Sequence, residues 1–157
     1  MRLGSPWGPE KGGEIMTALG LKIFDEAVQD ANRWVNEVAE RAGGLDKRHA
    51  YRILRAVLHV LRDNLPPNEA AHLGAQLPTL VRGIYYEAWA PAKTPRKLRH
   101  RDEFIAEVQR VYGAEPIEEP ERAIAAVLDT LDAHVSPGEM EDVRGALTRD
   151  VRALFAW

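Results

Sequence analysis

The chain has 157 residues, a net charge of −3, and 45% hydrophobic against 29% charged residues, which is the balance of a folded globular protein. It contains no cysteine, which excludes disulfide bonds, thiolate nucleophiles and cysteine-ligated metal centres. No apolar run approaches the ~20 residues that a membrane helix needs, so we expect no membrane partner. The lack of cysteine fits a reducing cytoplasm, so we expect a soluble cytoplasmic protein.

Residues 1–16 form the first segment, which is rich in glycine and proline and shows neither helical nor strand periodicity. This composition predicts a disordered tail. Met16 stands just before the first periodic segment, and the codons for residues 11–14 can encode a purine-rich stretch like a bacterial ribosome-binding site. The alternative is that translation starts at Met16 and residues 1–15 are translated leader. Neither interpretation gives them a function.

Residues 17–90 follow as a first unit with helical periodicity throughout. Apolar residues at three- and four-residue spacing predict a helix that ends at Gly43-Gly44, a common C-terminal stop. Asp46 is placed to cap the next helix, and Pro66-Pro67 ends it. Pro78 opens the last helix of the unit. The predicted helices span about residues 21–42, 46–66, 69–77 and 78–89.

Residues 91–101 connect this unit to a second one. The connector carries five basic residues and no acid, whereas residues 102–157 carry 13 acidic and five basic residues. Helical periodicity again predicts four helices, and Ser136 with Glu139 has the sequence of a capping box. The predicted helices lie near residues 101–112, 120–134, 137–146 and 149–156.

The two units match each other without a gap when the chain is shifted by 70 residues. The matched pairs include Glu37/Glu107, Ala56-Val57-Leu58/Ala126-Val127-Leu128, Pro67/Pro137, Glu69/Glu139 and Val81-Arg82/Val151-Arg152. This predicts a tandem duplication, and hence an all-α orthogonal bundle of about eight helices with pseudo-twofold symmetry and one core shared by both units. His59 aligns with Asp129, which predicts a solvated position for His59.

Three stretches of the first unit resemble a known family. They are residues 52–61, 65–78 and 82–89, and the later Arg99-His100-Arg101 and Phe104 agree with them. Together they are similar to the bacterial and archaeal family described as domain of unknown function 2267, over about Leu21 to Trp157. The resemblance implies a small helical protein with a duplicated core, and it carries over no reaction and no catalytic residue. Because the second unit departs from these motifs, we expect any specialised site in the first.

One pair of residues has the spacing of a metal site. Glu69 and His72 lie three residues apart, so a helix places both on one face, as in carboxylate-bridged di-iron bundles. Glu139 and Asp142 occupy the equivalent places in the second unit and complete a set of four candidate ligands. The alternative, which we favour from sequence alone, is that Glu69 and Glu139 cap the starts of their helices.

A second candidate surface combines polar and aromatic residues. Gln76, Arg82, Tyr86 and Trp89 fall within a few helical turns, and such residues are enriched where proteins bind partners or small ligands. Ordinary packing is the simpler interpretation of this spacing.

The connector is a third candidate, for phosphate groups. Lys93, Arg96, Lys97 and Arg99 offer ammonium and guanidinium groups to a nucleic acid or another polyanion. The alternative is that the connector docks onto the acidic second unit, since the chain as a whole lacks the basic bias of nucleic-acid-binding proteins.

These observations favour a non-catalytic helical binding or scaffold protein with no cofactor, which binds an unidentified protein partner or itself. A stress-related or regulatory role is suggested by analogy alone. The first alternative is a metal- or small-ligand-binding protein or enzyme that uses Glu69 and His72. The second is a polyanion binder that uses residues 93–101.

Overall fold

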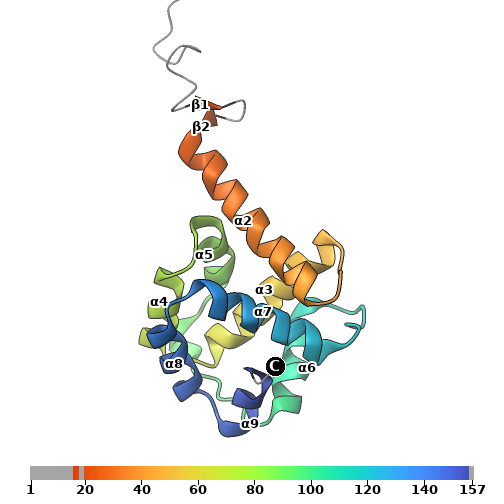
Figure 1. The fold of residues 1–157 in the computed structure, drawn as a ribbon. Helices are drawn as coiled ribbons and strands as arrows, with labels where there is room; N and C mark the ends of the chain where they lie inside the picture. The colour runs from red at the N-terminus through yellow and green to blue at the C-terminus, as the bar shows by residue number, and fades with distance from the viewer. Residues whose placement is uncertain (1–15, 18–19, 156–157) are drawn as a thin grey trace, which may run out of the picture.

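The protein, as a computed structural model, is described over residues 16–17 and 20–155 and is all-α, as predicted (Figure 1). Of the tail predicted for residues 1–16, residues 1–15 lie outside the described residues, and Met16 lies in a strand. A pair of two-residue antiparallel strands, β1 (Met16–Thr17) and β2 (Gly20–Leu21), differs from the prediction, which contains no strand. The helices of the described chain are α2 (Lys22–Arg41), α3 (Lys47–Asp63), α4 (Pro67–Ala75), α5 (Thr79–Tyr86), α6 (Arg101–Tyr112), α7 (Pro120–His134), α8 (Pro137–Ala146) and α9 (Arg149–Arg152), with 3-10 turns η1 (Pro91–Lys93) and η2 (Ala153–Phe155).

The ends of the helices follow from the residues that punctuate the sequence. Gly43 and Gly44 have φ angles of 93° and 95°, which glycine adopts without strain, so the helical conformation of α2 ends before them. The Asp46 side chain accepts a hydrogen bond from the backbone N–H of His49 at the start of α3. Pro67 and Pro137 open α4 and α8, where the missing N–H costs nothing.

The core is centred on α3 and α7, which lie in the middle of the bundle (Figure 1). Every residue of α3 from Ala56 to Arg62 is buried, because α2, α5, α6 and α7 all pack around this helix. Residues 123–128 of α7 are buried in the same way. A single core therefore joins both halves of the chain.

The helix boundaries recur at the offset of the sequence repeat. The offset of 70 takes Pro67, the first residue of α4, to Pro137, the first residue of α8, and takes Thr79 of α5 to Arg149 of α9. The elements of the second half are shorter or broken at its end, where η2 continues from α9. The pseudo-twofold relation between the halves stays a prediction.

Two polar side chains inside the bundle hold α3 to the end of α5. Arg62 is only 3% exposed and donates to the carbonyl oxygens of Tyr85 and Glu87, both at 2.7 Å. His59 is buried too, with Nε2 at 2.7 Å from the Ile84 carbonyl oxygen, and burial lowers its pKa. The predicted solvated position of His59 is therefore wrong, because the aligned pair does not share one environment.

Helix α2 is the longest element and extends beyond the rest of the bundle at its N-terminal end (Figure 1). Its C-terminal half is anchored by Trp34 and Val38, which are buried against α3 and α7. Within the described residues, no helix is both long and apolar enough to cross a membrane.

Candidate metal centre

Two short helices from different halves of the chain, α4 and α8, pack against each other and are tied at one end. Gln76 follows α4, and Ser136 caps α8. The Gln76 side-chain amide donates to Ser136 Oγ at 3.0 Å, and its oxygen accepts from the Ser136 backbone N–H at 2.8 Å. This reciprocal pair holds the first turn of α8 beside α4.

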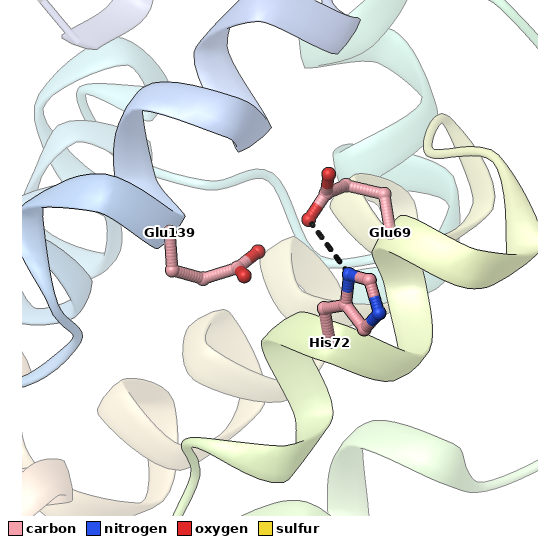
Figure 2. Close-up of side chains that lie close together, drawn as sticks. All are labelled: Glu69, His72 and Glu139. Carbon is pink, nitrogen blue, oxygen red and sulfur yellow. Dashed lines mark ion pairs between the residues drawn. The ribbon is translucent and has the colours of Figure 1, made fainter.

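Glu69, His72 and Glu139 meet across this contact, and we call them the α4–α8 site. One ligand atom from each residue lies within 4.8 Å of the other two. Figure 2 shows the carboxylate of Glu139 pointing from α8 toward the two side chains on α4. His72 Nδ1 is 3.9 Å from Glu69 Oε2, which is an ion-pair distance but too long for a hydrogen bond.

The site is buried at one side and open at the other. Glu139 is 9% exposed, and the side chain of Glu69 is 19% exposed. The Oε2 atoms of both glutamates are buried and have no hydrogen-bond partner. The His72 side chain is 69% exposed, so solvent reaches the site past the imidazole. A buried carboxylate oxygen without a partner is costly, so these two atoms require an explanation.

Burial changes the protonation of the site. Burial first, then the neighbouring Glu69 carboxylate, and then the charge of Asp142, raise the pKa of Glu139 to about 8. A proton shared by the two glutamates therefore relieves their repulsion near neutral pH. A metal ion that used both carboxylates would replace that proton.

The capping role favoured from sequence is wrong for the side chains of both glutamates. The Glu139 backbone N–H does donate to Ser136 Oγ, at 3.3 Å, but the Ser136 N–H goes to Gln76 rather than back to the Glu139 carboxylate. Helix α4 is preceded by Pro66, which has no N–H for Glu69 to accept. Neither carboxylate is used to cap its helix, and both remain available to the site.

The structure brings together three of the four predicted ligands. Asp142 is exposed on α8 and is not among the residues that converge, although its charge acts on Glu139. A di-iron site also uses a glutamate from each of two further helices, and Glu37 and Glu107 are the candidates that the repeat pairs. Glu37 binds His134 at 2.9 Å instead, and Glu107 binds Arg96 at 2.8 Å. A dinuclear centre of the di-iron type is therefore not assembled from these residues.

Two carboxylates and one imidazole suit borderline divalent metals such as zinc, manganese and iron. Ligand bonds of about 2.0–2.2 Å to such an ion place neighbouring ligand atoms about 3–3.5 Å apart, so the 4.8 Å limit of the site requires small side-chain rotations. Calcium prefers six to eight oxygen ligands, which this set does not supply. Three protein ligands leave coordination positions for water on the open side.

Comparison with protein families agrees with the resemblance seen in the sequence. The family model described as uncharacterized conserved protein DUF2267 matches residues 31–154, which includes every residue of the α4–α8 site. The chain belongs to the DUF2267 family. No curated protein matches the chain.

The polar and aromatic residues predicted as a ligand or partner surface of this DUF2267 protein are held by intramolecular contacts. Arg82 donates to three carbonyl oxygens at the end of α4, including those of Gly74 and Leu77. The Tyr86 hydroxyl donates to the Ala71 carbonyl oxygen at 3.4 Å, and the Tyr86 ring lies 5.2 Å from that of Trp89. With Gln76 tied to Ser136, these residues position α4 and α5. A ligand surface here stays a prediction.

The basic connector docks onto the protein in part. Arg96 binds Glu107, and its backbone N–H donates to the Asp63 carbonyl oxygen at 2.8 Å. Arg101 binds Glu121 at 2.7 Å, as the docking alternative predicts. The other three cations predicted to bind a polyanion are exposed: Lys93, Lys97 and Arg99.

A second histidine cluster of the DUF2267 protein was missed by reasoning from sequence. His49 Nδ1 lies 2.8 Å from Asp46 Oδ2, and Nε2 lies 3.0 Å from Glu115 Oε1. Arg52 joins the cluster by binding Glu115 at 3.3 Å, and a cavity of about 390 Å³ lies beside it. The signal was present, because Asp46 and His49 have the same three-residue spacing as Glu69 and His72. We call these four residues the His49 cluster.

Proposed function

We propose that this DUF2267 protein binds one divalent transition-metal ion between α4 and α8, with Glu69, His72 and Glu139 as its ligands. The observation that carries the proposal is the pair of buried carboxylate oxygens without hydrogen-bond partners, one on each helix. A cation satisfies both atoms at once, in place of the proton that the two carboxyl groups share in the metal-free protein. The neighbouring imidazole supplies the nitrogen ligand that favours a transition metal over calcium or magnesium.

The charge and access of the site support the same conclusion. Two carboxylates neutralise a divalent ion, which matters because Glu139 is buried. The exposed His72 gives the ion a route of entry. Since the ligands come from both halves of the chain, the bound ion links α4 to α8. We therefore propose a binding protein that is stabilised by its metal, and we assign no reaction to it.

The test is a calorimetric titration of metal-free protein with zinc, manganese and cobalt. We expect one ion per chain for at least one of these metals. Glu139→Gln and His72→Ala should each weaken binding by more than about 100-fold, since even the groups that only orient a metal ligand contribute about 10- to 100-fold. Glu141→Gln is the matched control, because Glu141 is an exposed glutamate on the same helix, and it should bind as the unmodified protein does.

The cobalt form adds a spectroscopic readout. A d–d absorption band that appears in the unmodified protein and in Glu141→Gln, but not in Glu139→Gln, supports the assignment. The proposal is wrong if none of the metals binds stoichiometrically, or if Glu139→Gln binds as tightly as its control.

A further inference from the structure

The cavity of about 390 Å³ beside the His49 cluster lies between the turn that joins α2 to α3 and the loop that joins α6 to α7 (Figure 1). Its lining residues come from both halves of the chain, within residues 44–53 and 112–118, and none of them belongs to the α4–α8 site. Its volume is within the range of about 300–1,000 Å³ that is typical of small-molecule pockets. We call it the α3–α6 cavity.

One polar group that opens to this cavity has no partner. Tyr112, the last residue of α6, lines the cavity and is only 8% exposed. Arg52 covers one face of its ring, with the guanidinium carbon 4.0 Å from the ring centre. The Tyr112 hydroxyl has no hydrogen-bond partner within the described chain, and it is not fully enclosed by protein. Because a hydroxyl in a largely buried side chain normally has a partner, this group points to a ligand in the cavity.

The cavity is also acidic. The described residues that line it include three carboxylates and one imidazole, and neither lysine nor arginine: Asp46, Glu115, Glu118 and His49. His49 contacts Asp46 and Glu115, and Arg52 binds Glu115. Glu118 is exposed and has no ion-pair partner within the described chain. With His49 protonated and Arg52 charged, the three carboxylates leave one net negative charge, which favours a ligand with one positive charge.

The other cations near the cavity do not neutralise Glu118. Lys47 and Arg48 precede His49 on α3, but each residue turns the helix by about 100°, so they lie on other sides of it, and neither lines the cavity. Arg122 of α7 pairs with Glu119 at 3.9 Å. The charge of Glu118 is therefore available to a ligand.

Apolar side chains form the rest of the wall, from Leu45, Ile53, Pro116 and Ile117. Such walls bury the hydrocarbon part of an organic ligand and offer nothing to a bare metal ion. A ligand with a carboxylate group would be repelled by Glu118. The lining therefore suits an organic cation with an apolar body.

We propose that the α3–α6 cavity binds a small primary amine in its ammonium form. The ammonium group binds the Glu118 carboxylate and donates a hydrogen bond to the Tyr112 hydroxyl oxygen. The hydrocarbon part of the amine packs against Ile53 and Ile117.

Titration of the full chain with n-butylamine at pH 7, followed by two-dimensional amide NMR, tests this proposal. The buffer contains EDTA, so the result is independent of the metal site, and about 0.15 M salt screens non-specific attraction. We expect saturable shifts centred on residues 44–53 and 112–118, with a dissociation constant of about 1 mM. Butan-1-ol and butyrate have the same number of carbons and should bind at least about tenfold more weakly, because neither carries the positive charge.

Two variants test the polar contacts. Tyr112→Phe removes only a hydroxyl without a protein partner, so the fold should be unchanged and the dissociation constant should rise about 3- to 10-fold. Glu118→Gln removes the charged partner and should raise it by about tenfold or more. Glu119→Gln is the matched control, because Glu119 follows Glu118 in the same loop, pairs with Arg122 and does not line the cavity. It should bind as the unmodified protein does.

The proposal is wrong if n-butylamine causes no saturable shifts, or if butan-1-ol or butyrate binds as tightly as n-butylamine. It is also wrong if folded Tyr112→Phe or Glu118→Gln binds n-butylamine as tightly as Glu119→Gln does. If Tyr112→Phe does not fold, Glu118→Gln decides alone, because Glu118 is exposed and its substitution leaves the core intact.

Discussion

Two clusters in this protein combine a histidine with carboxylates from both halves of the chain, and they differ in how the polar atoms are satisfied. In the His49 cluster both ring nitrogens lie within 3.0 Å of a carboxylate oxygen, and Arg52 adds a permanent positive charge. In the α4–α8 site the shortest ion pair is 3.9 Å, and two buried carboxylate oxygens have no hydrogen-bond partner. The contacts within the His49 cluster satisfy its ring nitrogens, whereas the contacts within the α4–α8 site leave two carboxylate oxygens unsatisfied.

The difference teaches that residue types at metal-ligand spacing do not by themselves make a metal site. Asp46 and His49 have the same spacing as Glu69 and His72, but a protonated His49 can bind both of its carboxylate neighbours without a metal. What distinguishes the α4–α8 site is the burial of unsatisfied oxygen atoms, a property that only the packing of α4 against α8 creates.

The largest expected effect is stabilisation by metal. An ion present at 100 times its dissociation constant raises the free energy of unfolding by about 2.7 kcal/mol, which corresponds to a melting temperature higher by roughly 5–10 °C for a chain of this size. Thermal unfolding should show this shift in the unmodified protein and in His49→Gln, and show none in Glu139→Gln. If His49→Gln abolished the shift, the metal would bind at the His49 cluster, and the assignment to the α4–α8 site would be wrong.

The next effect concerns the metal-free protein. The pKa of Glu139 is raised to about 8 in the folded state from its ordinary value of 4.5, so the folded state holds a proton that the unfolded state releases. Stability should therefore fall as pH rises from about 4.5 to 8 and then level off. Glu139→Gln removes this dependence and can donate to Glu69. We expect it to be more stable than the unmodified protein by about 1–3 kcal/mol at pH 8.5.

Urea denaturation in EDTA at pH 5.5 and 8.5 measures this difference. Glu141→Gln should retain the pH dependence of the unmodified protein. If the free energy of unfolding changed between the two pH values by the same amount in Glu139→Gln and in the unmodified protein, the two glutamates would not share a proton.

A smaller effect is expected where α4 is tied to α8. Gln76→Ala removes both hydrogen bonds to Ser136, on an exposed side chain, at a cost of about 1 kcal/mol. Because the tie only positions the ligands, metal binding should weaken by a few-fold rather than be lost. Calorimetric titration of the variant checks this, and a complete loss of binding would contradict it.

The smallest effect belongs to the His49 cluster. Hydrogen bonds to Asp46 and then Glu115 raise the pKa of His49. A group whose pKa is raised by folding stabilises the folded state in acid and loses that contribution as pH rises through the raised value. His49→Gln should therefore lower stability at pH 6 and leave it unchanged at pH 9. Equal losses at both pH values would mean that His49 acts through packing alone.

Much of this fold follows from local signals in the sequence. Glycines with positive φ, the Asp46 cap and the helix-opening prolines mark ends that do not depend on the rest of the chain, so the predicted helices agree with the structure. The environment of His59 could not be predicted, because its burial depends on where α5 lies relative to α3.

The candidate site could be predicted only in part. Helical spacing pairs Glu69 with His72, and the repeat offset adds Glu139. The same offset adds Asp142, which is exposed and lies outside the converging residues, because side-chain burial is set by tertiary packing and not by alignment. Pro66 carries a further signal, because it has no N–H and Glu69 therefore has no backbone donor to cap at that position.

The central claim is that a metal ion binds where carboxylate oxygens are buried without partners. Anomalous X-ray diffraction from crystals grown with zinc or manganese, recorded above the absorption edge of the metal, tests it most directly. We predict one peak per chain, about 2.0–2.2 Å from a carboxylate oxygen of Glu69, a carboxylate oxygen of Glu139 and a ring nitrogen of His72. No peak between α4 and α8, or a peak at the His49 cluster instead, would contradict it.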